Sequence, residues 1–386
     1  MVAAPAAILA LLTLKPRDEG RRGHIDDFHT DEAPGLFAGL NGLPEGSLAT
    51  DPSYRTTRED QLGPLRGRVP APGAAPFPAA DAVARDFHPI PDRGDPTGLD
   101  PHSRPPRGAA GPRVRTSFAP EQEGRCPGYA NANPTRVDRP AEARRRVESR
   151  RAITGRGPRW PAIDPKVGDY PESSRIDDRG LQSITIGRRG AAILRRPEAP
   201  PRPAWTGAVL DPARRGPRPI RDRDEPVEPR GSGGPIRRIA VDGPGREELT
   251  LSLTNRPRET APNRIIRPAG RDRVEAGLGL GVNSCHRDRS ARQVRRNGDP
   301  DAALTALAHG GYRRLGKRLR GHETAARQRL SRSFVEAAGT VKVEDAAIGV
   351  RSGRRGHNPI PREAALDREA APMPWPGDRR TRFAFD

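Results

Sequence analysis

The chain has 386 residues and a formal net charge of +20, with 31% charged and 33% hydrophobic residues, so it can form two or three domains with thin cores. It holds 42 glycines and 45 prolines, more than a tightly packed protein usually carries, and only 4% aromatic residues to anchor a core. The two cysteines, Cys126 and Cys285, exclude a disulfide framework and a cysteine-rich zinc site, and they suit a reducing, cytoplasmic setting.

Nearly all of the positive charge is arginine, because only four residues are lysine. An excess of this kind favours polyanionic partners, and nucleic acid first among them. A GC-rich coding strand also produces many Arg, Pro, Gly and Ala residues, so this second explanation of the composition stays open.

Residues 1–80 are expected to form helices and turns followed by a linker. The apolar run Ala6–Leu14 is too short to span a bilayer, and arginines follow it rather than precede it, so it is also a poor secretory signal. We expect it to be the end of a helix whose start precedes Met1. Apolar residues in 36–43 recur at a helical interval, and residues 61–80, rich in Pro, Ala and Gly, predict a linker.

Short strands and one basic helix are expected between residues 81 and 186. An apolar run from residue 82 ends at Asp86, and a strand pair is predicted around Phe118 and Tyr129. Residues 140–152 (PAEARRRVESRRA) predict a strongly basic helix with its proline at the start, where a missing N–H costs little.

Asp164 stands where a strand is expected to end, ahead of an acidic turn and a second strand at Gln182–Ile186. An Asp in this position is well placed to hold a metal, because the backbone there is rigid and the side chain points out of the sheet. The same residues also suit an Asp–Pro turn without chemistry, since both residue types are common turn formers.

Strands and one long helix are expected in the second half of the chain. A proline-rich segment with a dense run of Arg and Asp covers about 195–235, and two strands follow at Ile236–Val241 and Leu249–Thr254. Residues 301–320 predict the best helix, with Asp301 as its cap and basic residues in its last turn. Two further short strands are predicted in the tail, at 340–344 and 347–351.

Three acids stand out as candidate ligands, Asp86, Asp164 and Glu275, each at the end of a strand-like run or inside a helix-like run. Carboxylates of this kind can hold two divalent ions about 3.5–4 Å apart, which stabilise both oxygens of a phosphodiester exchange. Magnesium suits such a site because it takes oxygen ligands. The chain carries 49 acids, so spacing alone does not select this triple. Nucleotide-binding P-loop, nucleophile-elbow and zinc-finger motifs are absent from the sequence.

Six segments resemble bacterial insertion-sequence DDE transposases of the group with a β-rich insertion before the catalytic glutamate, and together they extend over nearly the whole chain. ARDFHPIPDRGDP resembles the strand of the first Asp, GYANANPT the next strand, AIDPKVGDYPESSRIDDRGLQSITIGRRG the region of the second Asp, and RDRVEAGLGLGVNSCHRD the glutamate helix. Two further segments resemble parts outside the catalytic core of these transposases. The segment ahead of the catalytic domain is matched by HIDDFHTDEAPGLFAGLNGLPEGSLATDPSYRT, and the C-terminal end is matched by HNPIPREAALDREAAPMPWPGDRRTRFAF.

The resemblance implies an α/β fold, an RNase H-like mixed sheet flanked by helices, with a β-containing insertion. It divides the chain into an N-terminal helical remnant and linker at 1–80, a first part of the catalytic domain at 81–186, the insertion at 187–260, a glutamate-bearing helical part at 261–335, and a C-terminal tail with short strands at 336–386.

By the same resemblance, Asp86, Asp164 and Glu275 are the catalytic acids and the ligands of two Mg²⁺ ions, with Mn²⁺ as an alternative. The reaction implied is cleavage and strand transfer of DNA at the ends of an insertion sequence. The partner is double-stranded DNA, both terminal inverted repeats and target, bound in the bacterial cytoplasm by a homodimer and without a membrane. The residues expected to contact DNA are Arg271, Arg144, Arg145, Arg146, Arg150, Arg151 and Lys166.

The glutamate helix keeps part of the pattern of these transposases. Arg271 and Glu275 keep the expected four-residue spacing, whereas Pro268 and Val282 replace a tyrosine and a lysine. We expect the helix to begin at or after Arg267, since proline is tolerated in a first helical turn but costs roughly 3 kcal/mol inside a helix.

Two other functions remain open on the sequence alone. The chain can be an inactive, decayed or truncated copy of such a transposase, or a disordered, arginine-rich nucleic-acid-binding chain without catalysis. A folded structure would argue against the disordered chain. Convergence of the three acids and metal-dependent nicking of DNA would distinguish an active transposase from a decayed copy.

Overall fold

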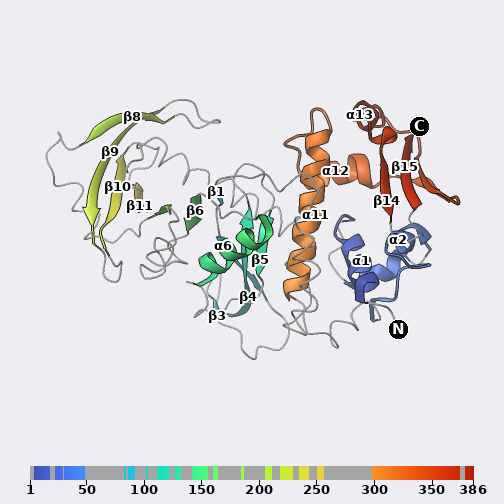
Figure 1. Ribbon diagram of the computed structural model, residues 1–386, viewed down its shortest axis with the longest axis horizontal. Helices are drawn as coiled ribbons and strands as arrows, with labels where there is room; N and C mark the ends of the chain where they lie inside the picture. Colours follow the sequence, from blue (N-terminus) through green and yellow to red (C-terminus); the bar gives the residue numbers. More distant parts are fainter. Residues whose placement is uncertain are drawn as a thin grey trace. The chain divides into compact units, whose positions relative to one another are not determined.

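The computed structural model describes residues 4–17, 22–28, 30–47, 82–83, 86–91, 101–102, 111–120, 127–131, 141–154, 160–163, 184–186, 205–210, 218–228, 234–242, 250–255, 298–373 and 379–386 (Figure 1). The chain divides into two compact units. The first unit comprises Met1–Val69, Ile90–Arg113 and Gly279–Asp386, and the second comprises Pro70–Pro89 and Val114–Leu278. Helices occur together with antiparallel and mixed sheets, as expected for an α/β chain. Within the described ranges, no helix has the length and apolar character needed to cross a membrane.

A seven-stranded mixed sheet forms the framework of the second unit. Its first three strands pair in parallel, and the remaining pairs are antiparallel. The strands follow in the order β1 (Ala82–Val83), β6 (Trp160–Ile163), β7 (Ile184–Ile186), β11 (Thr250–Thr254), β10 (Ile236–Asp242), β9 (Arg218–Val227) and β8 (Thr206–Leu210). The predicted strands at 236–241 and 249–254 are confirmed as β10 and β11, and β7 confirms the last part of the strand predicted at 182–186.

Strands β8 and β9 were not predicted, because their segment is rich in proline and charge. The structure shows how such a sequence enters a sheet. Arg238 of β10 lies opposite Glu225 of β9 and forms an ion pair with it, and Arg237 pairs diagonally with Asp224. Cross-strand pairs of opposite charge stabilise neighbouring strands. The apolar contribution comes from the central strands, whose most buried side chains are Ile239, Val241 and Leu251.

A separate small sheet has the strand order β2 (Asp86–Pro91), β4 (Gly111–Pro120) and β3 (Pro101–His102). Strand β5 (Pro127–Asn131) also pairs with β4. Strands β4 and β5 are antiparallel, with Phe118 opposite Ala130. This confirms the strand pair predicted around Phe118 and Tyr129. The basic helix predicted at 140–152 is confirmed as α6 (Ala141–Thr154), which begins directly after Pro140.

The first unit joins the beginning of the chain to its end. Helix α1 (Ala4–Leu14), the 3₁₀ segment η1 (Arg22–Phe28) and helix α2 (Glu32–Phe37) share a small core of Ala10, Leu14, Ile25, Ala38 and Leu43. The side chain of Asp31 caps α2 by accepting a hydrogen bond from the amide of Ala33, 3.2 Å away. Helix α1 confirms the helix predicted over the apolar run Ala6–Leu14.

The C-terminal part of the first unit begins with the long helix α11 (Gly298–Arg318). It confirms the helix predicted at 301–320, but it starts three residues earlier, so Asp301 lies inside the first turn and is not the cap. Pro300 is accommodated there because the amides of a first turn have no helical partner. The helix ends at a turn in which Gly321 has a φ of 76°, a left-handed conformation that glycine adopts without strain.

Beyond α11 the chain forms a four-stranded sheet with short helices before and between its strands. These helices are α12 (Arg327–Leu330), the π-helical turn η4 (Ser331–Val335), α13 (Pro359–Glu363) and the 3₁₀ turn η5 (Leu366–Arg368). The strands follow in the order β12 (Gly339–Val343), β13 (Ala347–Ser352), β15 (Arg379–Phe385) and β14 (Ala370–Met373). Only the β13–β15 pair of this sheet is parallel. The strands predicted at 340–344 and 347–351 are thereby confirmed.

A buried polar cluster holds the end of α1 against the helices of the C-terminal part. Tyr312 is 5% exposed, and its hydroxyl donates a hydrogen bond to the carbonyl of Pro16 at 2.7 Å. The Arg327 guanidinium lies 5.4 Å from the Tyr312 ring centroid and donates to the carbonyl of Lys15. Burial raises the pKa of the Tyr312 hydroxyl, which therefore stays protonated and available as a donor. Residues 296 and 312 positions apart in the sequence are thus joined by hydrogen bonds to backbone oxygens.

We predict that Tyr312→Phe loosens α1 without affecting the second unit. Loss of the hydrogen bond to Pro16 should lower the free energy of local opening of α1 by about 1 kcal/mol. Amide hydrogens of α1 should therefore exchange roughly fivefold faster. Hydrogen exchange measured by mass spectrometry over 4–17 tests this, with the peptides of β10 and β11 as internal control. Unchanged amide exchange over α1, or an equal increase in β10 and β11, would show that the hydrogen bond from Tyr312 to Pro16 does not hold α1 in place.

Candidate active site

The two strands that lead toward the predicted aspartates are adjacent and parallel. In the seven-stranded sheet, Ala82 of β1 lies opposite Trp160 of β6, and Val83 lies opposite Pro161. Asp86 follows Val83 by three residues, and Asp164 follows Pro161 by the same interval. The chain therefore approaches both aspartates from neighbouring strands that run in the same direction and in matching register.

The structure describes one of the three predicted acids. The prediction of Asp86 at the end of a strand is wrong, because Asp86 is the first residue of β2, in the sheet with β4 and β3, whereas the strand adjacent to β6 is β1. Asp164 comes directly after the last residue of β6, which agrees with its prediction at a strand end, but Asp164 itself and Glu275 lie outside the described residues. Convergence of the three carboxylates therefore remains a prediction. Within the described ranges, no three His, Cys, Asp or Glu side chains gather as a metal-binding group.

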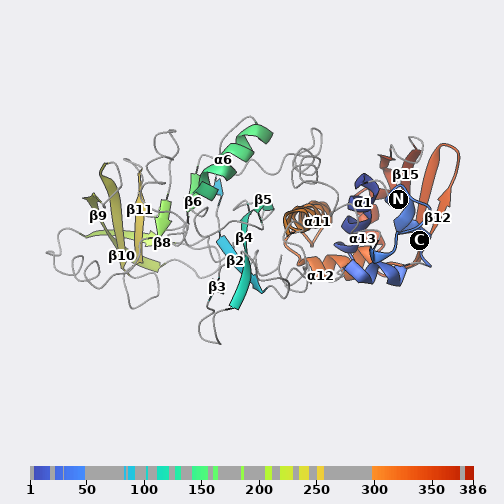
Figure 2. The same ribbon diagram turned by 90° about the horizontal axis from the view of Figure 1, so that it is seen from below.

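All five arginines predicted to contact DNA between 144 and 151 lie on α6, and Lys166 and Arg271 lie outside the described residues. The exposed side chain of Arg145 pairs with Glu142 at 3.0 Å, and the half-buried side chain of Arg144 lies 3.8 Å from Glu148. Arg151 is exposed in the last turn of the helix. Helix α6 contacts both β5 and β6 (Figure 2), so its arginines are carried next to the strand that precedes Asp164.

A buried carboxylate fixes α6 in this position. Glu142, in the first turn of the helix, is completely buried and accepts a hydrogen bond from the side-chain amide of Asn131 at 2.7 Å. The Arg145 guanidinium donates to the same oxygen at 3.0 Å. Asn131 is the last residue of β5 and is itself 6% exposed. A buried charge needs partners of this kind, since an unpaired carboxylate in the interior is strongly unfavourable.

Sequence reasoning did not select Asn131 or Glu142 as site-building residues. An acid in the first helical turn has an ordinary surface role there, because it complements the positive end of the helix dipole. The asparagine lies in GYANANPT, but nothing in that segment indicates which side chain faces a helix eleven residues later.

Comparison with known proteins finds similar solved structures but no sequence relatives. The chain matches no known family model, and its sequence matches no curated protein significantly. Among solved structures, it resembles the piggyBac transposase in a synaptic complex with hairpin DNA, determined by electron cryo-microscopy, with a TM-score of 0.42 and 11% sequence identity. The match covers 85% of this chain and 69% of the transposase chain. A TM-score this low does not establish a common fold, and no functional conclusion follows from it.

We predict that Asn131→Ala destabilises the second unit by about 1.5–3 kcal/mol, because it removes a hydrogen bond to a buried charged group. Glu148→Gln is the matched control, since it removes a long, half-exposed ion pair on the same helix and should cost at most about 0.5 kcal/mol. Urea denaturation followed by circular dichroism measures both free energies of unfolding. Equal effects of the two substitutions would show that Asn131 does not anchor α6.

Proposed function

We propose that the chain is a DDE-type DNA transposase, a polynucleotidyl transferase that cleaves DNA at the ends of an insertion sequence and transfers the strands. The observation that carries this proposal is the register of β1 and β6. Val83 and Pro161 are directly opposed and precede Asp86 and Asp164 by three residues each, so two neighbouring parallel strands lead the chain toward both aspartates, with Asp86 at the start of β2.

The spacing of such a pair suits the proposed chemistry. Neighbouring strands lie about 4.8 Å apart, which is close to the separation of about 3.5–4 Å between the ions of a two-metal site. Asp86, Asp164 and Glu275 would supply only oxygen donors, the ligand type that Mg²⁺ and Mn²⁺ prefer. The chemistry supplied by two such ions, when bound, is activation of the attacking oxygen and stabilisation of the leaving oxygen of a phosphodiester.

The remaining roles belong to side chains of the chain. The arginines of α6 would hold DNA phosphates beside the end of β6, a contact that positions the duplex without reading its sequence. Arg271 lies four residues before Glu275, a spacing that would place both on one face of the predicted helix, so the arginine would face the DNA backbone next to the acids.

The architecture that we propose is RNase H-like, with the catalytic domain formed by 81–186 and 261–335. The observed strand order supports it in one respect. The antiparallel strands β8, β9, β10 and β11 all fall within 187–260 and attach to the parallel strands through β7, as a β-containing insertion in a single sheet would do. The proposed partner is double-stranded DNA, both terminal repeats and target, held by a homodimer.

Metal-dependent nicking of a supercoiled plasmid tests the catalytic proposal. We expect nicking with Mg²⁺ or Mn²⁺, none with a chelator, and a loss of activity below detection in Asp86→Asn, Asp164→Asn and Glu275→Ala. Asp367→Asn, an exposed acid in η5, is the control and should leave nicking unchanged. Nicking that survives Glu275→Ala would show that this residue is not the third acid.

A second experiment separates an active enzyme from a decayed copy. Pro268→Tyr together with Val282→Lys restores the two residue types that related transposases carry around the glutamate, and it should raise metal-dependent nicking. A folded chain that binds DNA but shows no nicking even after this restoration is an inactive remnant. A circular dichroism spectrum without helix or strand signals would instead identify a disordered, arginine-rich chain.

A further inference from the structure

The sheet at the C-terminal end of the first unit has two chemically different faces. Ile348, Thr381 and Met373 lie on one face and are at most 5% exposed. The alternation of side chains along a strand assigns the neighbouring residues to the opposite face. That face carries four exposed cations, which we call the basic face: Lys342, Arg351, Arg380 and Arg382.

The cross-strand register places these four cations close together. Lys342 of β12 lies opposite Gly349 of β13, and Gly349 lies opposite Arg382 of β15, so the lysine and the arginine share one row across three strands. Strands are about 4.8 Å apart and residues rise about 3.3 Å each, so neighbouring cations on the face are roughly 7–10 Å apart at their backbone positions. Arg351 and Arg380 occupy the adjacent rows on either side.

Small residues separate the cations, which leaves the charged groups as the most prominent features of the face. The positions between and beside them are held by Thr340, Ala347, Gly349, Ala370, Pro372 and Ala384. All are exposed or half-buried. A sheet of this composition forms a shallow surface from which long cationic side chains extend into solvent.

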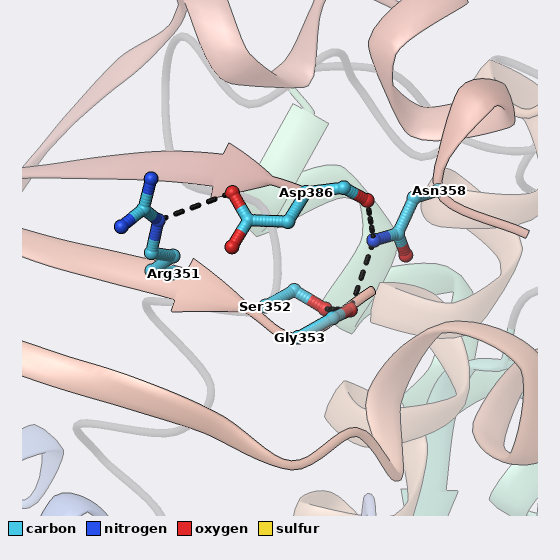
Figure 3. A network of polar contacts seen from close by, with 5 residues as sticks. All are labelled: Arg351, Ser352, Gly353, Asn358 and Asp386. Atoms are coloured by element: carbon cyan, nitrogen blue, oxygen red, sulfur yellow. Dashed lines mark hydrogen bonds and ion pairs between the residues drawn. The ribbon is translucent and has the colours of Figure 1, made fainter. Parts of the chain in front are cut away.

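Two of the four cations have weak partners and two have none among the described residues. Lys342 lies 3.1 Å from Glu344, and Arg351 lies 3.1 Å from Asp386, yet their side chains remain 76% and 69% exposed. Figure 3 shows the second pair, with Asp386 held by a hydrogen bond from the side chain of Asn358 to its backbone oxygen. Exposed pairs of this kind contribute little and exchange readily for another anion. Within the part of the chain that the structure describes, neither Arg380 nor Arg382 forms an ion pair.

We propose that the basic face binds the phosphate backbone of double-stranded DNA, independently of base sequence and separately from α6. The charge and shape of the face support a polyanion, and the choice of duplex DNA rests in part on the proposed function. The aromatic side chains of β15, Phe383 and Phe385, stack on each other on the opposite side of the sheet, with ring centroids 6.4 Å apart. Among the described residues, the basic face therefore offers no ring on which an unpaired base can stack, which disfavours single strands.

The test uses the full chain and fluorescence anisotropy with a labelled duplex of random sequence, titrated between about 50 and 200 mM salt. Arg380→Gln with Arg382→Gln should weaken binding roughly tenfold at the middle of this range and reduce the slope of log K against log salt by about 1.8, because two phosphate contacts are lost. Arg314→Gln with Arg329→Gln is the matched control. It removes the same charge from exposed positions on α11 and α12 and should change affinity by no more than about twofold.

Further variants keep each outcome decisive. Arg380→Lys with Arg382→Lys retains the charge and should retain the salt slope, which separates a lost contact from a lost fold. Equal weakening of DNA binding by the two Gln double variants would mean that net charge alone governs binding, and it would overturn the proposal. Unchanged affinity of the Arg380/Arg382 double variant, or tighter binding of a single strand than of a duplex, would also overturn it. Glu275→Ala should bind duplex as the natural chain does, so a failure of catalysis and a failure of the basic face are told apart.

Discussion

The parallel register of β1 and β6 is the constraint on which the proposed function depends. These strands come from segments nearly 80 residues apart, and their hydrogen bonds set Val83 against Pro161. The antiparallel strands from β8 to β11 attach to the same sheet through β7, and α6 lies against β6. The seven-stranded sheet thus carries the strands that precede Asp86 and Asp164 in the chain, the antiparallel strands and the contact with the basic helix.

Arginine serves three distinct purposes in this chain. In β10, Arg237 and Arg238 pair with acids of β9 and help to hold together a sheet segment poor in apolar residues. In α6, Arg145 neutralises the buried carboxylate of Glu142 while it stays exposed enough to meet solvent. On the basic face, Arg380 and Arg382 form no ion pair with any residue that the structure describes. The net charge of +20 therefore does not show which cations can bind a polyanion, since many arginines already pair with acids within the fold.

In the first unit, buried polar contacts add to small apolar cores. The hydroxyl of Tyr312 and the guanidinium of Arg327 both donate to backbone oxygens at the end of α1. Such bonds form in an interior of low dielectric, where they are strong and where an unpaired group is costly. This arrangement holds the end of α1 near α11, α12 and η4, which precede the basic face in the chain.

The sequence by itself determined the local elements whose signals lie within a few residues. Apolar, β-branched runs predicted β10 and β11, a proline followed by a basic run predicted α6, and the long helix was found to within three residues of its start. Only the tertiary structure decided the features that depend on partners distant in the chain: the strands of the arginine- and proline-rich segment, the burial of Glu142 against Asn131, and the common face of Lys342 and Arg382. Charged residues carry no local signal of this kind, because the same arginine or glutamate is stable in solvent, in a cross-strand pair or at a buried anchor, and the choice is made by whichever partner the fold brings within reach.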